Sequence, residues 1–196
     1  MCKRTFDLAG SLFLLLALAP LMALIAIAIW LDSGRPIFFS QLRVGRHFRR
    51  FRIWKFRSMR SQAAGSRITA AGDRRVTRIG RILRTAKLDE LPQLFNVLRG
   101  DMSLVGPRPE VPEYVEMFRE RYTRILGVRP GITDLASLIY RHEEAILGGV
   151  PDAEREYISH LLPKKLDLAE EYLQRRSAWL DLSILLRTLF VAVRTS

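Results

Sequence analysis

Cysteine is almost absent from this sequence, because Cys2 is the only one among 196 residues. A single cysteine can form neither a disulfide framework nor a cysteine-based metal site within the chain, which indicates a reducing, cytoplasm-facing location. The histidines His47, His142 and His160 are scattered, without the spacing of metal ligands. Glycine-rich loops that cradle nucleotide phosphates are also missing. Most familiar catalytic patterns are therefore excluded.

Charge is absent from one long segment, the 24 residues from Leu8 to Leu31. As a single helix this segment would rise about 36 Å, enough to cross a bilayer core. Pro20 lies near its middle and predicts a break or strong kink. Basic residues flank both ends, which favours the cytoplasmic side for both. The residues leave open a re-entrant hairpin and a kinked span; a signal peptide cleaved after Ala19 is disfavoured, because the apolar run continues.

Acidic residues are scarce in the next segment, where 16 Lys or Arg stand between Arg35 and Lys87 against one acid, Asp73. The whole chain carries a formal net charge of +12. Such basicity suits contact with an anionic membrane surface or with nucleic acid. Aromatic residues interleave with the basic ones around Trp54 and could stack on bases, but the apolar segment argues against a nucleic-acid binder.

Strand and helix signals follow the apolar segment. Residues 37–41 and 48–56 are rich in aromatic and β-branched types and predict a short β-hairpin with its turn at 43–46. Residues 61–75 predict a loop, and apolar spacing predicts helices near 79–83 and over 91–98, the second ending at Gly100. The proline-rich stretch 106–112 excludes regular helix, and 114–126 predicts an amphipathic helix.

The tail from Lys164 onward predicts a second membrane contact. Its apolar stripe comprises Trp179, Leu182, Leu186, Leu189, Phe190 and Val193. Asp181, Arg187 and Arg194 interrupt this stretch, which is therefore too charged to span a bilayer. A helix lying in the membrane interface is one interpretation. An ordinary amphipathic helix packed on the core is the alternative.

Adjacent carboxylates at Asp89 and Glu90 follow the basic run and precede an apolar-periodic helix that tolerates Pro92 only in its first turn. A structural interpretation makes Asp89 an N-cap and Glu90 a first-turn acid, a device that contributes about 1 kcal/mol. A functional interpretation uses the same position. An ionised aspartate beside basic residues can attack phosphorus, while a neighbouring carboxylate holds a divalent cation. Spacing alone favours the cap.

Four motifs change this balance. They are Lys55-Phe56-Arg57-Ser58-Met59, the run from Leu88 to Leu98, Gly100-Asp101-Met102-Ser103-Leu104-Val105-Gly106-Pro107-Arg108-Pro109, and Val128-Arg129-Pro130-Gly131-Ile132-Thr133. In this order they resemble the monotopic phosphoglycosyl transferases, also called the bacterial sugar transferase family. The resemblance covers nearly the whole chain.

This resemblance implies an undecaprenyl-phosphate sugar phosphotransferase, which moves a phospho-sugar from a nucleoside diphosphate sugar, usually a UDP-sugar, to a polyprenol phosphate such as undecaprenyl phosphate. It implies release of UMP and initiation of surface glycan or glycoconjugate assembly. Asp89 corresponds to the nucleophile that forms a covalent aspartyl phospho-sugar, and Glu90 to its partner, the pair holding Mg²⁺. The family's phosphate-binding positions correspond to Lys55, Arg84, Arg108 and Arg129.

The expected fold is α-rich α+β: a single small domain with a re-entrant N-terminal membrane helix broken at Pro20, a short β-hairpin and interfacial amphipathic helices. Residues 1–34 would form the anchor, and 35–196 a catalytic domain on the cytoplasmic face of the bacterial inner membrane, in contact with membrane lipids. Ala19 stands where the family commonly has Ser, so the break depends on Pro20. Residues 134–162 diverge from the family, and we expect them to help select the sugar. A non-catalytic basic membrane module is the competing function.

Overall fold

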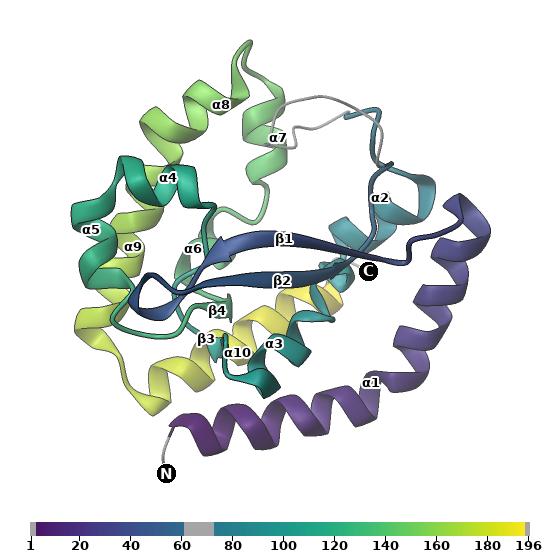
Figure 1. Cartoon of the computed structure of the whole chain (residues 1–196), viewed down its shortest axis with the longest axis horizontal. Helices are drawn as coiled ribbons and strands as arrows, with labels where there is room; N and C mark the ends of the chain where they lie inside the picture. Colours follow the sequence, from purple (N-terminus) through teal and green to yellow (C-terminus); the bar gives the residue numbers. More distant parts are fainter. Residues whose placement is uncertain (1–2, 61–72, 195–196) are drawn as a thin grey trace.

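The computed structural model describes residues 3–60 and 73–194, with side chains up to residue 190. Its described part is rich in helix and contains two small sheets (Figure 1). The helices are α1 (Lys3–Ser33), α2 (Arg78–Thr85), α3 (Gln93–Arg99), α4 (Pro112–Met117), α5 (Arg119–Ile125), α6 (Leu135–Ile139), α7 (Glu143–Gly148), α8 (Ala153–Glu156), α9 (Leu162–Arg175) and α10 (Ala178–Arg194), with short turns η1 (Arg46–Phe48), η2 (Leu88–Glu90) and η3 (Tyr157–Leu161). The strands are β1 (Phe38–Val44), β2 (Arg50–Phe56), β3 (Ser103–Val105) and β4 (Gly131–Thr133).

Helix α1 is the element that the uncharged segment predicts. Among the described residues it is the one helix long and apolar enough to cross a membrane. It stays helical through Pro20, but Figure 1 shows that it bends midway, with one half along the lower edge and the other rising on the right. Asp7 is buried and accepts hydrogen bonds from Ser103 Oγ (2.9 Å) and Leu104 N (3.0 Å). The first half of α1 is therefore fixed to the domain, while re-entry into one leaflet stays a prediction.

The predicted β-hairpin is present, with a different turn. Strands β1 and β2 pair antiparallel in the register Phe38 to Phe56 and Val44 to Arg50. The predicted turn at 43–46 begins too early, because Val44 still belongs to β1. The turn instead has positive φ at His47 (54°) and at the residue after it. A hydrogen bond from His47 N to Leu126 O (2.8 Å) accounts for this position, which the local sequence does not encode.

Helices α2 and α3 lie where apolar spacing predicts them. Thr77 caps α2 by accepting a hydrogen bond from Gly80 N (2.9 Å), and α3 ends at Gly100, whose φ of 92° suits glycine. The predicted helix over 114–126 is wrong in one respect, because it is split into α4 and α5 at Phe118. Residues 61–72 of the predicted loop lie outside the described residues.

The second sheet is a short parallel pair that the sequence did not predict. Strand β3 pairs with β4 through Ser103 opposite Gly131 and Val105 opposite Thr133. A Cβ on Gly131 would lie 2.1 Å from Gly106 N, so glycine is required at this close approach. Since β3 is buried and leads into residues 106–111, this pairing fixes the loop that carries Arg108.

Helix α10 packs one face against the core, as the alternative interpretation of the tail predicts. Its Ile184 is buried in the core, and its buried Asp181 accepts from Tyr172 Oη (2.6 Å) and pairs with Lys3 Nζ (2.5 Å). On the same helix most of the predicted stripe is exposed, including Trp179 at 78%. Val193 lies outside the described side chains. One face packs against the domain and another stays uncovered, so interfacial placement remains a prediction.

Candidate active site

The Asp89–Glu90 pair sits on a turn between α2 and α3. Lys87 adopts a left-handed conformation (φ 56°), which redirects the chain into the one-turn 3-10 helix η2. Neither η2 nor α3 receives a side-chain cap, and α3 begins only after Pro92. The interpretation of Asp89 as a helix N-cap is therefore wrong. Its carboxylate is left available for another role.

Glu90 is held by two cations from different parts of the chain. Its Oε1 accepts hydrogen bonds from Lys55 Nζ (2.8 Å) and Arg108 Nη2, and its Oε2 accepts from Arg108 Nη1 at 3.2 Å. Lys55 comes from β2, and Arg108 from the loop after β3. Two predicted phosphate-binding residues are thus brought to the predicted pair. The forked contact is the geometry that arginine provides and lysine does not.

Asp89 is also buried, with 5% of its surface exposed, but its contacts differ from those of Glu90. Its Oδ1 has no hydrogen-bond partner among the described residues, and neither does the buried Nε2 of Gln93. An unpartnered buried oxygen costs free energy unless a ligand completes it. Gln93 is the fourth residue after Asp89 in the sequence, and both lie in the η2–α3 segment. The two unpartnered atoms belong to polar groups that a substrate bound beside Asp89 could satisfy.

The pKa values of the two carboxylates are shifted in opposite directions. Burial raises the pKa of Asp89, against the opposing effect of the Lys55 charge. Burial also acts to raise the pKa of Glu90, but the charges and hydrogen bonds of Arg108 and Lys55 outweigh it and hold that pKa well below its usual range. Glu90 in turn raises the pKa of the Arg108 guanidinium. Glu90 is therefore stabilised as an anion, whereas Asp89 takes up a proton at a higher pH than an ordinary aspartate.

Two residues that the sequence interpretation did not single out position these groups. Asn96, fully buried, accepts from Trp54 N (3.1 Å) and donates to Arg52 O (2.8 Å), which ties α3 to β2 and sets Lys55 beside Glu90. Asp134 accepts from Arg108 N (3.2 Å) and caps α6 through Ser137 N. Asn96 lies within the motif from Leu88 to Leu98, and that motif is the sequence signal that could have identified it. Asp134 falls at one of the departures from the family.

The loop carrying Arg108 is braced by a buried acid on its other side. Glu110 accepts from Arg43 Nη1 (2.6 Å) and Tyr157 Oη (2.6 Å). Burial acts to raise the pKa of Glu110, but Arg43 and Lys165 keep it lowered. Because the brace joins β1 and η3 to this loop, Arg108 is presented to Glu90 from a rigid support.

The other two predicted phosphate-binding residues have different partners. Arg84 pairs with Glu144 (Nη2 to Oε1, 2.5 Å), and its charge acts to lower the pKa of Asp89. Arg129 Nε donates to Gly100 O (2.8 Å), at the end of α3 remote from Asp89. Helix α3 is seven residues, about 10 Å, long. The structure therefore places Arg84 near the pair and Arg129 apart from it.

The carboxylates of Asp89 and Glu90 fit Mg²⁺ only as a site that substrate phosphates complete. Among the described residues there is no group of three or more His, Cys, Asp or Glu that could hold a metal. Mg²⁺ is commonly held by one or two carboxylates together with substrate phosphates. Asp89 Oδ1 has no partner in the described part of the chain, and the three hydrogen bonds to Glu90 leave that carboxylate one further acceptor position. A shared protein–phosphate site fits these groups, and an all-protein cage does not.

Known proteins match this chain over the helices and strands that build the Asp89–Glu90 site. The model of the bacterial sugar transferase family matches residues 1–195. The chain is 45% identical over 196 residues to an undecaprenyl-phosphate glucose phosphotransferase of Komagataeibacter xylinus, which spans 95% of this chain and 35% of that protein. It is 41% identical to a UDP-glucose:undecaprenyl-phosphate glucose-1-phosphate transferase of Caulobacter vibrioides, covering 95% of this chain and 67% of the relative.

A third relative carries a different sugar in its name. It is a UDP-N-acetylgalactosamine-undecaprenyl-phosphate N-acetylgalactosaminephosphotransferase of Aeromonas hydrophila, 39% identical, with 95% of this chain and 42% of that protein covered. The chain thus spans less than half the length of two of these three relatives. With a family match across all the elements that build the Asp89–Glu90 site, the chain belongs to the bacterial sugar transferase family.

Proposed function

We propose that this chain transfers a sugar phosphate from a UDP-sugar to undecaprenyl phosphate, through a covalent intermediate on Asp89. The observation that carries the proposal is the contrast within the pair: Asp89 has a buried oxygen without a partner, while both oxygens of Glu90 are bound by cations. The names of the relatives support the donor class and the acceptor. Their differing sugars leave the donor sugar to experiment.

In the first step, a carboxylate oxygen of Asp89 attacks the phosphorus that bears the sugar. The bond from that phosphorus to the bridging oxygen breaks, and UMP leaves with this oxygen. In the second step, a phosphate oxygen of undecaprenyl phosphate attacks the same phosphorus. This restores the Asp89 carboxylate and forms the lipid diphosphate sugar. Splitting one difficult displacement into two is the advantage of a covalent intermediate.

Lys55 and Arg108 would stabilise the charge that develops on the phosphate oxygens. Within the described residues, Lys55 uses one of its three donors on Glu90 and Arg108 uses two of its five, so donors remain for substrate. Fixed donors of this kind stabilise a transition state without reorganising during the reaction. Glu90 holds both cations in place and, with Asp89, would hold Mg²⁺, which neutralises the donor's diphosphate when bound.

The membrane anchor fits a lipid acceptor. Helix α1 exposes large apolar side chains along its length, and α10 exposes several more. We propose that both contact the membrane on its cytoplasmic face in bacteria, α1 as a re-entrant hairpin bent near Pro20. A site held at headgroup height would meet the phosphate of an acceptor that cannot leave the bilayer.

A UMP-release assay tests this function. Full-length chain with Mg²⁺ and undecaprenyl phosphate is offered UDP-glucose and UDP-N-acetylgalactosamine in separate reactions. We expect sustained UMP release with at least one donor, dependent on the lipid acceptor, and none from Asp89→Asn. Turnover by Asp89→Asn equal to that of the wild type would refute the proposed role of Asp89. A role preserved in cells without Asp89 and Glu90 would favour a non-catalytic membrane module.

A further inference from the structure

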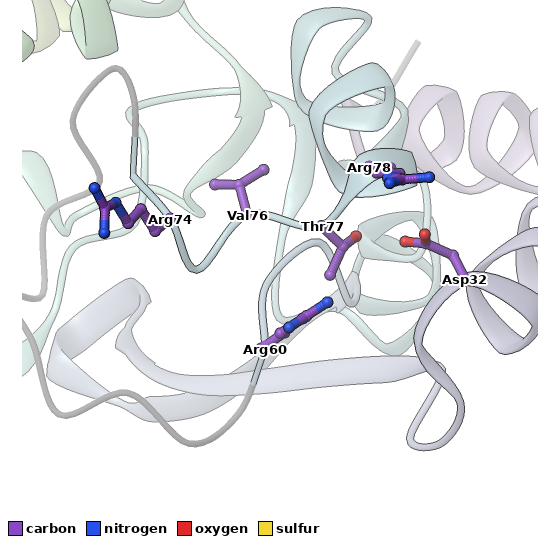
Figure 2. Close-up of a pocket in the computed structure, with 6 residues that line it drawn as sticks. All are labelled: Asp32, Arg60, Arg74, Val76, Thr77 and Arg78. Atoms are coloured by element: carbon purple, nitrogen blue, oxygen red, sulfur yellow. The ribbon is translucent and has the colours of Figure 1, made fainter.

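A second basic site lies at the opposite end of α2 from Asp89. A cavity of about 350 Å³ is lined by Asp32, Arg60, Arg74, Val76, Thr77 and Arg78 (Figure 2). The three arginines are exposed, and none forms an ion pair or hydrogen bond through its side chain with another described residue. Figure 2 shows Arg60 and Arg78 on either side of Thr77, with Arg74 beyond Val76. Three arginines from two segments of the chain thus line one small space.

The single acid of this cavity does not neutralise it. Asp32 Oδ2 accepts a hydrogen bond from Ile79 N (3.3 Å) in the first turn of α2, and it forms no ion pair with a described residue. With three arginines and one aspartate, the lining keeps a formal excess of positive charge. A guanidinium presents five donors in a plane and matches phosphate oxygens better than other side chains do. The cavity is therefore complementary to a phosphate group.

The position of the cavity identifies the source of that phosphate. Asp32 follows Trp30 and Leu31, which are 54% and 73% exposed at the end of α1. Apolar surface gives way to charged surface at this point, as it does at the headgroup level of a bilayer. Buried Arg57 donates to Ser33 O and Gly34 O, each at 2.7 Å. These hydrogen bonds hold the end of α1 against the segment that follows the hairpin.

Helix α2 separates the cavity from Asp89. The cavity includes Arg78 at the start of α2, whereas Asp89 follows its end. Eight helical residues separate the two positions by about 12 Å. A phosphate held by Arg78 is therefore set apart from the Asp89 backbone by the length of α2, and adding UDP in place of lipid tests whether a donor phosphate occupies the cavity instead.

We propose that the Arg60–Arg74–Arg78 cavity binds the phosphate of an anionic phospholipid headgroup and thereby seats the anchor at the membrane surface. The inference rests on the proposed membrane placement of α1 but not on the transfer reaction. Anionic phospholipid then acts as a bound ligand at a defined site, in addition to the general attraction of a chain with a net charge of +12.

Lipid titration of the full-length chain tests the proposal. The chain in neutral detergent is titrated with short-chain phosphatidylglycerol, and binding is followed by melting temperature and by native mass spectrometry. The cavity variant is R60Q/R74Q/R78Q. The control, R49Q/R50Q/R155Q, removes the same charge from exposed arginines at the hairpin turn and α8. We expect the cavity variant to lose roughly a hundredfold in affinity, and the control to change less than about threefold.

Two competing ligands distinguish a lipid phosphate from a free phosphate or a nucleotide as the occupant of the cavity. Inorganic phosphate and UDP, added in place of the lipid, should bind the wild type at least about tenfold more weakly than phosphatidylglycerol. Equal binding of either one, or equal lipid affinity of the cavity variant and the wild type, would overturn the proposal. The single variants R60Q, R74Q and R78Q replace the triple variant if its melting temperature shows that it does not fold; an unchanged affinity in all three has the same meaning.

Phosphatidylglycerol binding without UMP release in the same preparation would leave the lipid site standing and would contradict the proposed function. UMP release, together with equal lipid binding by the two triple variants, would support the proposed function and contradict the lipid site. The two ideas can therefore fail separately.

Discussion

Asp89 is the residue whose charge should control the rate. Burial raises its pKa, and only its ionised form can attack phosphorus. As pH falls, the proton therefore adds at a higher pH than for an ordinary aspartate, and the rate should decline earlier. Lys55→Gln removes a charge that opposes this rise, so we expect the acid limb of the UMP-release profile to move to still higher pH.

The matched control for this profile is Arg49→Gln, which removes an exposed positive charge at the hairpin turn. Its acid limb should coincide with that of the wild type. An acid limb of Lys55→Gln that stays in place or moves to lower pH would contradict the assignment of Asp89 as the titrating group.

Arg108 should be sensitive to loss of its fork, even when its charge is kept. Arg108→Lys preserves the cation but cannot donate to both oxygens of Glu90. Losing one charge-assisted hydrogen bond costs about 1.5–3 kcal/mol, so we expect UMP release to slow roughly 10- to 100-fold. Arg119→Lys alters an exposed pair in which Nη1 alone donates to both oxygens of Glu116, and it should leave the rate within about twofold. Equal rates for both variants would refute this role.

The residue scale also shows which site contacts a sequence can predict. Lys55 and Arg108 were assigned through motifs, and they do meet at Glu90. Arg84 lies outside the four motifs and was assigned only through the family resemblance, and its partner Glu144 lies 60 residues away in a divergent segment. No local pattern encodes that ion pair. Arg129 likewise contacts a backbone carbonyl, at Gly100, that becomes a neighbour only after folding.

At the scale of elements, α2 should depend on one close approach. A Cβ on Gly80 would lie 2.0 Å from the backbone oxygen of Ser58, which cannot move aside as a flexible side chain would. We expect Gly80→Ala to destabilise the fold by about 1–3 kcal/mol, measured by chemical unfolding. Gly149→Ala is the control, since its Cβ would make an ordinary contact at 3.7 Å and its φ of −89° suits alanine. Similar stabilities of the two variants would contradict the close packing of α2.

The elements also show where sequence reasoning succeeds and where it stops. Apolar spacing located α2 and α3, and Gly100 located the end of α3, because these signals are local. The division at Phe118 and the turn at His47 were not predicted, since contacts with distant backbone and core residues position them. The parallel pair β3–β4 joins two three-residue segments. Strands this short carry too little periodicity to be recognised.

At the scale of the whole molecule, we predict that both ends of the anchor face the cytoplasm. The natural Cys2 reports on the segment before the apolar run, and Arg50→Cys in a Cys2→Ser background reports on the exposed hairpin turn after it. A membrane-impermeant thiol reagent should label both sites in inside-out vesicles and neither in right-side-out vesicles. The basic flanks on both sides are the physical reason.

Labelling of the two sites from opposite faces would establish a span and refute the hairpin. A Pro20→Leu variant adds a second measurement, because removing the proline restores a backbone donor and favours a straight helix. We expect that variant to shift part of the population to opposite-face labelling.

The covalent intermediate is the central claim, and mass spectrometry tests it most directly. The chain is incubated with its UDP-sugar and Mg²⁺ but without lipid acceptor, then digested and sequenced. We predict one sugar phosphate on the peptide that contains Asp89, absent from Asp89→Asn and retained in Asp167→Asn, a control at an exposed aspartate of α9. Adding undecaprenyl phosphate should remove the sugar phosphate from Asp89. UMP release with no adduct, or an unchanged adduct in Asp89→Asn, would contradict the account.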